Sequence, residues 1–216
     1  MYQTVIFDLD GTLLNSLKDL AAAGNYVCQQ NGWPTHSLEE YRYFVGNGIP
    51  KLCERFSPPS HRTPEQLQQT LSQFQTYYAL HKQDFTAPYP GILQLLQNCI
   101  QNNIGIGVVT NKAHPFAQDI VNHYFSTMIP FVQGATSDIP AKPNPIGVLA
   151  LMQKMHANPA STLFVGDSNV DIFTASNAQI DSCGVLWGFR TKQELIEAGA
   201  THIAQNPDAL WNIISH

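Results

Sequence analysis

The stretch Val5–Ser16, VIFDLDGTLLNS, decides the fold, because an apolar run of strand length stops at a carboxylate. Asp8 ends the run, Asp10 follows two positions later, and Gly11 opens a turn. A continuous apolar run is typical of a parallel strand that is buried on both faces. Ligands bind outside the carboxyl ends of such strands, so the stretch predicts two acidic groups where an open parallel sheet binds its ligand.

Strand-length and helix-length segments alternate along most of the remaining chain. The strand-like runs are 4–7, 104–110, around 131, 162–166, 182–188 and 202–204. The helix-like runs between them are 91–103, 114–125, 145–155, 170–178 and 192–199. This alternation predicts an α/β fold, a Rossmann-like parallel sheet covered by helices.

One region interrupts the alternation, because residues 16–84 contain no convincing strand. Apolar residues at helical spacing follow Ser16, which is the expected N-cap, with Asp19 as an acid near the positive helix end. Further helices are expected at 38–44, 49–56 and 64–81. We therefore expect an α/β core formed by 1–15 and 85–216, with 16–84 inserted as an all-helical cap.

Composition excludes several classes of protein. The chain has 216 residues, a formal net charge of −5 and no run of Lys or Arg, which argues against a nucleic-acid or anionic-membrane surface. The N-terminus lacks the pattern of a signal peptide, and no apolar stretch could span a bilayer. The four cysteines form no CxxC pair, so buried reduced thiols in a cytoplasmic protein are expected.

Other polar side chains follow the same expected sheet edge. Thr110 closes the second strand, Asp167 closes the strand at 162–166, and Lys142 lies in the connection AKPNP. Carboxylates gathered at one edge repel each other. A hard dication such as Mg²⁺ resolves this repulsion, because it is bound by one or two carboxylates together with waters and substrate phosphate.

The motifs DLDGTLLNS, VVTNK, KPNP and GDSNVD, in this order, resemble those of the haloacid dehalogenase-like hydrolases. The resemblance covers nearly the whole chain, including the helical insertion, which is similar to the cap of that superfamily. Within it, VGNGIPKLCERF, PYPGI and the segment from Trp187 to Leu210 look like bacterial phosphoglycolate phosphatases. The resemblance implies Mg²⁺-dependent hydrolysis of a small phosphorylated metabolite, with 2-phosphoglycolate as the expected substrate, by a monomer or homodimer.

The resemblance also implies roles for single residues. Asp8 would be the nucleophile that forms an aspartyl-phosphate, and Asp10 the general acid and then the base. Thr110 and Lys142 would bind the phosphoryl group. The metal would be held by the carboxylates of Asp8 and Asp167 and by the carbonyl oxygen of Asp10. The further acid Asp171 would orient Lys142 or the bound waters. Asn111 and Ser168 stay open between a phosphate contact and a structural role.

The cap offers one candidate site of its own. Gly46, Asn47 and Gly48 form a glycine-rich turn before a helix that carries Lys51 in its first turn. A helix N-terminus attracts anions, so the turn and Lys51 could meet a substrate carboxylate. An ordinary connecting turn is the alternative reading.

Rival functions share parts of this pattern. Sugar-phosphate phosphatases and β-phosphoglucomutase-like phosphomutases have the same core motifs, and a need for a bisphosphate activator would reveal a mutase. A phosphate-binding regulatory protein is the non-enzymatic alternative, although loss of catalysis would remove the need for Asp10. Dehalogenases lack such an acid, and phosphonate-cleaving relatives typically replace it with a small residue.

Overall fold

A computed structural model describes residues 1–216 and divides the chain into two compact units. One unit combines Met1–Leu14 with Pro88–His216, and the other is Asn15–Ala87. The expected insertion, 16–84, falls inside the second unit. The chain passes between the units at two short strands that pair with each other, β2 (Leu14–Asn15) and β3 (Ala87–Pro88).

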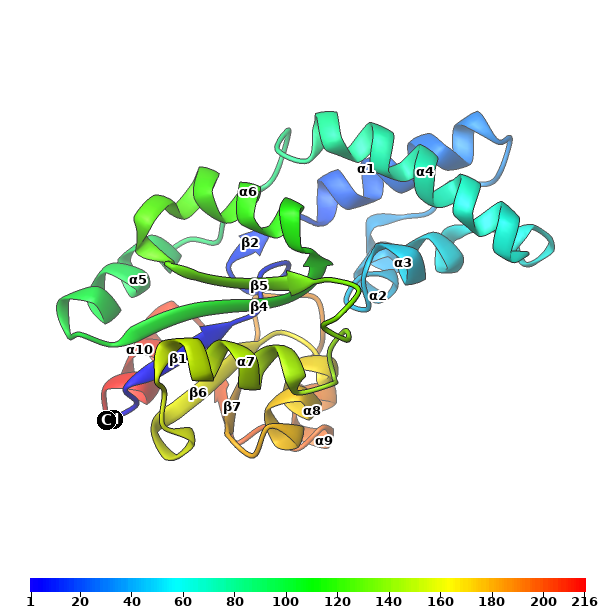
Figure 1. Cartoon of the computed structure of the whole chain (residues 1–216). Helices are drawn as coiled ribbons and strands as arrows, with labels where there is room; N and C mark the ends of the chain where they lie inside the picture. Colours follow the sequence, from blue (N-terminus) through cyan, green and yellow to red (C-terminus); the bar gives the residue numbers. More distant parts are fainter. The chain divides into compact units, whose positions relative to one another are not determined.

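The first unit is built on a six-stranded parallel sheet, which confirms the α/β, Rossmann-like prediction (Figure 1). Its strands are β1 (Thr4–Phe7), β4 (Gly105–Ala113), β5 (Phe131–Ala135), β6 (Thr162–Gly166), β7 (Asp181–Val185) and β8 (His202–Ala204). They lie in the order β5-β4-β1-β6-β7-β8. The chain winds outward from β1 to β5 and then returns to the other side of β1. This reversal creates the crevice at the carboxyl ends where open α/β sheets bind ligands.

Helices cover both faces of this sheet (Figure 1). One face packs against α5 (Ile92–Gln101), α6 (His114–Phe125) and α10 (Pro207–Ser215). The other packs against α7 (Ile146–Met155), α8 (Asn169–Asn177) and α9 (Lys192–Glu197). In β1, Val5 and Phe7 enter the first layer and Ile6 enters the second. Because each strand is buried on both sides, its sequence is apolar without interruption.

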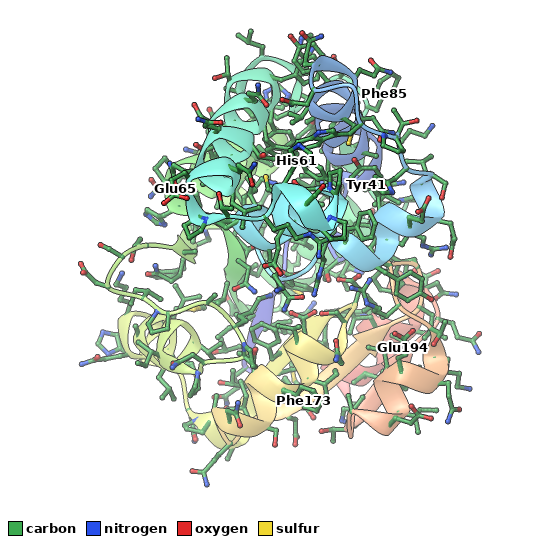
Figure 2. The ribbon with its side chains drawn as sticks, turned by 90° about the vertical axis from the view of Figure 1, so that its right-hand side faces the viewer. Tyr41, His61, Glu65, Phe85, Phe173 and Glu194 are labelled. Carbon is green, nitrogen blue, oxygen red and sulfur yellow. The ribbon has the colours of Figure 1, made fainter.

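The second unit consists of α1 (Leu17–Gln30), α2 (Leu38–Phe44), α3 (Ile49–Phe56) and α4 (Pro64–His81). Its core is aromatic: Tyr41, labelled in Figure 2, is fully buried, as are Phe74 and Tyr78, whose rings stack at 5.5 Å. A Ser37 capping box fixes the start of α2, and one at Thr63 fixes the start of α4.

Ser16 occupies the N-cap position of α1, as predicted, but its side chain makes no capping hydrogen bond. Asp19 is buried and serves another purpose. Its carboxylate accepts hydrogen bonds from the backbone N–H groups of Phe85 and Thr86 and, at 2.6 Å, from the Thr86 hydroxyl. Asp19 therefore ties the segment that leaves α4 to the first turn of α1.

Several elements escaped the sequence patterns. The C-terminal helix α10 and the short strands β2 and β3 were not predicted, and β7 ends at Val185, three residues earlier than expected. The short 3₁₀ turns at Pro59–His61, Ser126–Met128 and Pro159–Ser161 carry no periodicity that a sequence could show. No helix is both long enough and apolar enough to cross a membrane.

Candidate active site

The parallel register brings Asp8 and Asp167 together at the carboxyl edge of the sheet. Phe7 of β1 pairs with Val165 of β6, and the Asp8 N–H donates to the Val165 carbonyl at 2.8 Å. Carboxylate oxygens of Asp8, Asp167 and Asp171 all lie within 4.8 Å of one another. These residues are only 8%, 2% and 1% exposed. The sheet therefore concentrates three carboxylates in a space that is shielded from water.

Lys142 bridges two members of this cluster. Its ammonium lies 2.7 Å from an oxygen of Asp8 and 2.6 Å from an oxygen of Asp171. The other oxygen of Asp171 accepts hydrogen bonds from the Ser168 N–H and hydroxyl. Burial alone would lower the pKa of Lys142, but Asp171 and Asp8 outweigh it and hold that pKa above its ordinary value. Lys142 is therefore a fixed positive charge beside Asp8, and Asp171 orients it.

Asp167 is packed so closely against Gly11 and Gly188 that neither glycine could carry a side-chain atom there. Its carboxylate accepts hydrogen bonds from the Phe189 N–H at 2.8 Å and from the Thr12 hydroxyl at 3.3 Å. A Cβ added at Gly11 would lie 2.5 Å from Asp167, and one at Gly188 would lie still closer. Gly11 also has a φ of +91°, which disfavours other residues. The glycine of the DLDG motif is thus required twice, for its backbone angle and for the space around Asp167.

Two of the clustered carboxylates, Asp8 and Asp167, have a pKa above the ordinary value. Burial is the largest cause that raises the pKa of Asp167, to about 8, and the neighbouring carboxylates of Asp171 and Asp8 add to it. Burial likewise raises the pKa of Asp8 to about 6, although Lys142 opposes the shift. These carboxylates are clustered hard oxygen donors, and their raised pKa means that they are difficult to ionise without a counter-charge. They therefore fit a divalent cation such as Mg²⁺, which stabilises the ionised carboxylates.

Sequence reasoning missed the role of Lys112, which follows Thr110 by two positions within β4. Its side chain is only 2% exposed, and its ammonium lies 2.8 and 3.1 Å from the two oxygens of Asp10. The lysine stands in the VVTNK motif, so the signal was present, but the strand pattern did not show that it faces Asp10. The structure thus supplies a second buried ammonium at the same edge.

Thr110 and Asn111 lie within β4, which continues to Ala113, so the prediction that Thr110 closes this strand was wrong. Thr110 is buried, two residues beyond Val108, which pairs with Phe7, and its hydroxyl accepts a hydrogen bond from the Lys112 N–H. The Asn111 amide accepts from the backbone N–H of Lys142 at 2.7 Å and donates to its carbonyl at 3.2 Å. Asn111 therefore has a structural role, since it holds the backbone that carries Lys142.

The candidate residues of the cap form a local network within the helical unit. Gly48 is the N-cap of α3 with a φ of +83°, and the side-chain amide oxygen of Asn47 accepts a hydrogen bond from the Arg55 guanidinium at 2.8 Å. Lys51 pairs with Glu54 at 2.7 Å and is partly exposed. The turn at Gly46–Gly48 is thus braced by Arg55, and a carboxylate that binds Lys51 would compete with Glu54.

Comparisons with known proteins agree on one family. A family model described as "Haloacid dehalogenase-like hydrolase" matches residues 5–185. A phosphoglycolate phosphatase of Vibrio parahaemolyticus is 30% identical over 98% of this chain and 95% of its own length. One from Vibrio vulnificus is 31% identical over 97% of this chain and 95% of its own length.

Solved structures show the same similarity. A crystal structure from Lactobacillus delbrueckii subsp. bulgaricus superposes with a TM-score of 0.93 at 31% identity, covering 99% of this chain and 98% of that chain. A "predicted phosphoglycolate phosphatase" from Haemophilus somnus has a TM-score of 0.90 at 27% identity and covers 98% and 97% of the two chains.

Proposed function

This chain belongs to the haloacid dehalogenase-like hydrolase family and is a phosphatase of that family, and from this premise we propose that it hydrolyses 2-phosphoglycolate through a phosphorylated Asp8. The observation that carries the proposal is the ammonium of Lys142, 2.7 Å from Asp8 inside a buried cluster of three carboxylates. A carboxylate held beside a fixed cation, within a cluster that could hold a divalent cation, supports the role of Asp8 as the phosphoryl acceptor.

The carboxylates of Asp8 and Asp167, with the carbonyl oxygen of Asp10, would hold Mg²⁺. When bound, the ion neutralises negative charge on the phosphoryl oxygens and on the carboxylates. Asp167 is fixed for this task by the hydrogen bonds from Phe189 and Thr12. Asp171 is engaged by Lys142 and Ser168, which supports a role as the residue that orients Lys142.

The reaction proceeds in two steps. In the first, an oxygen of Asp8 bonds to phosphorus, the ester bond breaks, and Asp10 gives a proton to the leaving alkoxide. In the second, Asp10 takes a proton from water, whose oxygen bonds to phosphorus and releases inorganic phosphate and Asp8. Lys142 and Thr110 bind the phosphoryl oxygens in both steps, where added negative charge makes their contacts strongest.

The substrate assignment is supported by the names of relatives that match this chain over almost its full length. The cap turn at Gly46–Gly48, with Lys51, is proposed to contact the substrate carboxylate. The test is phosphate release from a panel of monoesters in Mg²⁺, compared by kcat/KM. The proposal expects 2-phosphoglycolate to rank first. A higher value for a sugar phosphate, or a need for a bisphosphate activator, would replace it with one of the rival activities.

A further inference from the structure

Asp10 stands apart from the other acidic groups of the site. It is only two residues from Asp8, yet its carboxylate does not belong to the group formed by Asp8, Asp167 and Asp171. Its two oxygens instead face the ammonium of Lys112 at 2.8 and 3.1 Å. The four carboxylates of this edge are therefore divided: three form one cluster, in which Lys142 pairs with Asp8 and Asp171, and the fourth, Asp10, pairs with Lys112.

Each side of this division has its own buried lysine. Lys142 serves Asp8 and Asp171, and Lys112 serves Asp10. A buried ammonium without a close counter-charge is strongly destabilising, so the pair with Asp10 constrains both side chains. Lys112 is also fixed along its backbone, since its N–H donates to Thr110 at 3.2 Å. The Asp10 carboxylate is thus held by a side chain that β4 carries.

We propose that Lys112 is a positioning residue that keeps the carboxylate of Asp10 away from the metal cluster. The inference rests on the proposed function, in which Asp10 transfers protons and Asp8 and Asp167 hold a divalent cation. A carboxylate this close in the sequence to a metal ligand is attracted to the doubly charged ion, and the attraction is stronger in a water-poor site. An oxygen drawn onto the metal is no longer available to the leaving group. The ammonium of Lys112 offers the competing attraction that prevents this.

The first test is Mg²⁺ binding by the full chain, measured by calorimetry without substrate. Lys112→Met keeps most of the length of the unbranched side chain and removes its charge. The Kd for Mg²⁺ should fall by roughly 3- to 30-fold, because a nearby positive charge is lost and a carboxylate is freed. Lys154→Met, on the exposed face of α7, is the matched control and should leave Kd unchanged. An unchanged or higher Kd in Lys112→Met would overturn the proposal.

The second test asks whether Lys112 acts through Asp10, using a double-mutant cycle. In the wild-type background, Lys112→Met should reduce kcat/KM for an alkyl phosphate by about 10- to 100-fold, as expected for a misplaced catalytic group. For an aryl phosphate with a good leaving group the loss should be below about 3-fold, because less protonation is needed. In the Asp10→Asn background, Lys112→Met should cause no further loss. An equal loss in both backgrounds would contradict a role through Asp10.

Lys112→Arg keeps the inference testable if the methionine variant does not fold. It retains a cation, so Kd for Mg²⁺ should stay within about twofold of wild type, with partial activity on alkyl phosphates. Mg²⁺ affinity raised by Lys112→Arg would overturn the proposal. A wild-type protein that binds Mg²⁺ but hydrolyses no monoester would refute the proposed function instead, while the calorimetric comparison still decides how Asp10 is held.

Discussion

Asp167→Asn is expected to stabilise the metal-free protein while it removes the response to Mg²⁺. The pKa of Asp167 is about 8 in the folded protein against an ordinary value of 3.8. Between these pH values the folded state retains a proton that the unfolded chain has released, so stability falls as pH rises through this window. Asp8, with a pKa of about 6, makes stability fall more steeply with pH at the acidic end of this window.

The size of the effect follows from the same values. Each pH unit in the window lowers the free energy of unfolding by at most about 1.4 kcal/mol per group, so Asp167 alone can lower it by up to about 6 kcal/mol by pH 8. The asparagine carries no charge, and its amide can still accept from the Phe189 N–H and donate to the Thr12 oxygen. We expect a gain of about 2–5 kcal/mol at pH 8 in excess chelator, or roughly 5–15 °C in Tm for a chain of this size.

The assay is a series of melting curves between pH 4 and pH 8, in chelator and in Mg²⁺. Wild-type Tm should fall with rising pH in chelator and recover in Mg²⁺, whereas the variant should be flatter and insensitive to Mg²⁺. Asp138→Asn, at an exposed position, is the control and should behave as wild type. A variant that melts at or below the wild-type temperature at pH 8 in chelator would refute the argument that burial strains this carboxylate.

Three further substitutions test other parts of the account. Asp10→Asn should reduce turnover of alkyl phosphates by about 10²–10⁴-fold and that of aryl phosphates by less, and equal losses would contradict an acid role. Asn111→Ala should lower kcat/KM, and it should lower the free energy of unfolding by about 1–3 kcal/mol, because the backbone of Lys142 loses two buried hydrogen bonds. An unchanged kcat/KM would show that these hydrogen bonds do not position Lys142. Lys51→Ala should reduce kcat/KM for 2-phosphoglycolate about 10–150-fold more than for a neutral monoester, and a common loss would exclude Lys51 as a carboxylate contact.

Much of the fold was predictable because buried strands and the helices that cover them each have a characteristic pattern of apolar residues in the sequence. The strands at 4–7, 162–166 and 202–204 and the helices at 38–44, 49–56, 64–81 and 114–125 have the predicted bounds. The C-terminal helix α10 was missed, although Asn206 accepts a hydrogen bond from Ala209 and Pro207 occupies the first turn, both recognisable start signals.

The site was predictable only where position along a strand implies position in space. Asp8 and Asp167 directly follow the neighbouring strands β1 and β6, so the sheet edge brings them together. The partners of Lys112 and Asn111 lie 102 and 31 residues away in the chain, and no local pattern encodes which side chain they face. Ser16 stands at the N-cap position as predicted, but the backbone angles of the chain entering α1 are not those of an extended N-cap, and its side chain makes no capping hydrogen bond.

The central claim is that this chain hydrolyses a phosphate monoester with Asp8 as the phosphoryl acceptor and a divalent cation beside it. The most direct measurement is phosphate release from 2-phosphoglycolate by wild type and by Asp8→Asn, each in Mg²⁺ and in excess chelator, on protein shown by melting to be folded and by mass to be free of deamidation. The account predicts turnover only by wild type in Mg²⁺. Turnover by Asp8→Asn, or by wild type in excess chelator, would contradict it.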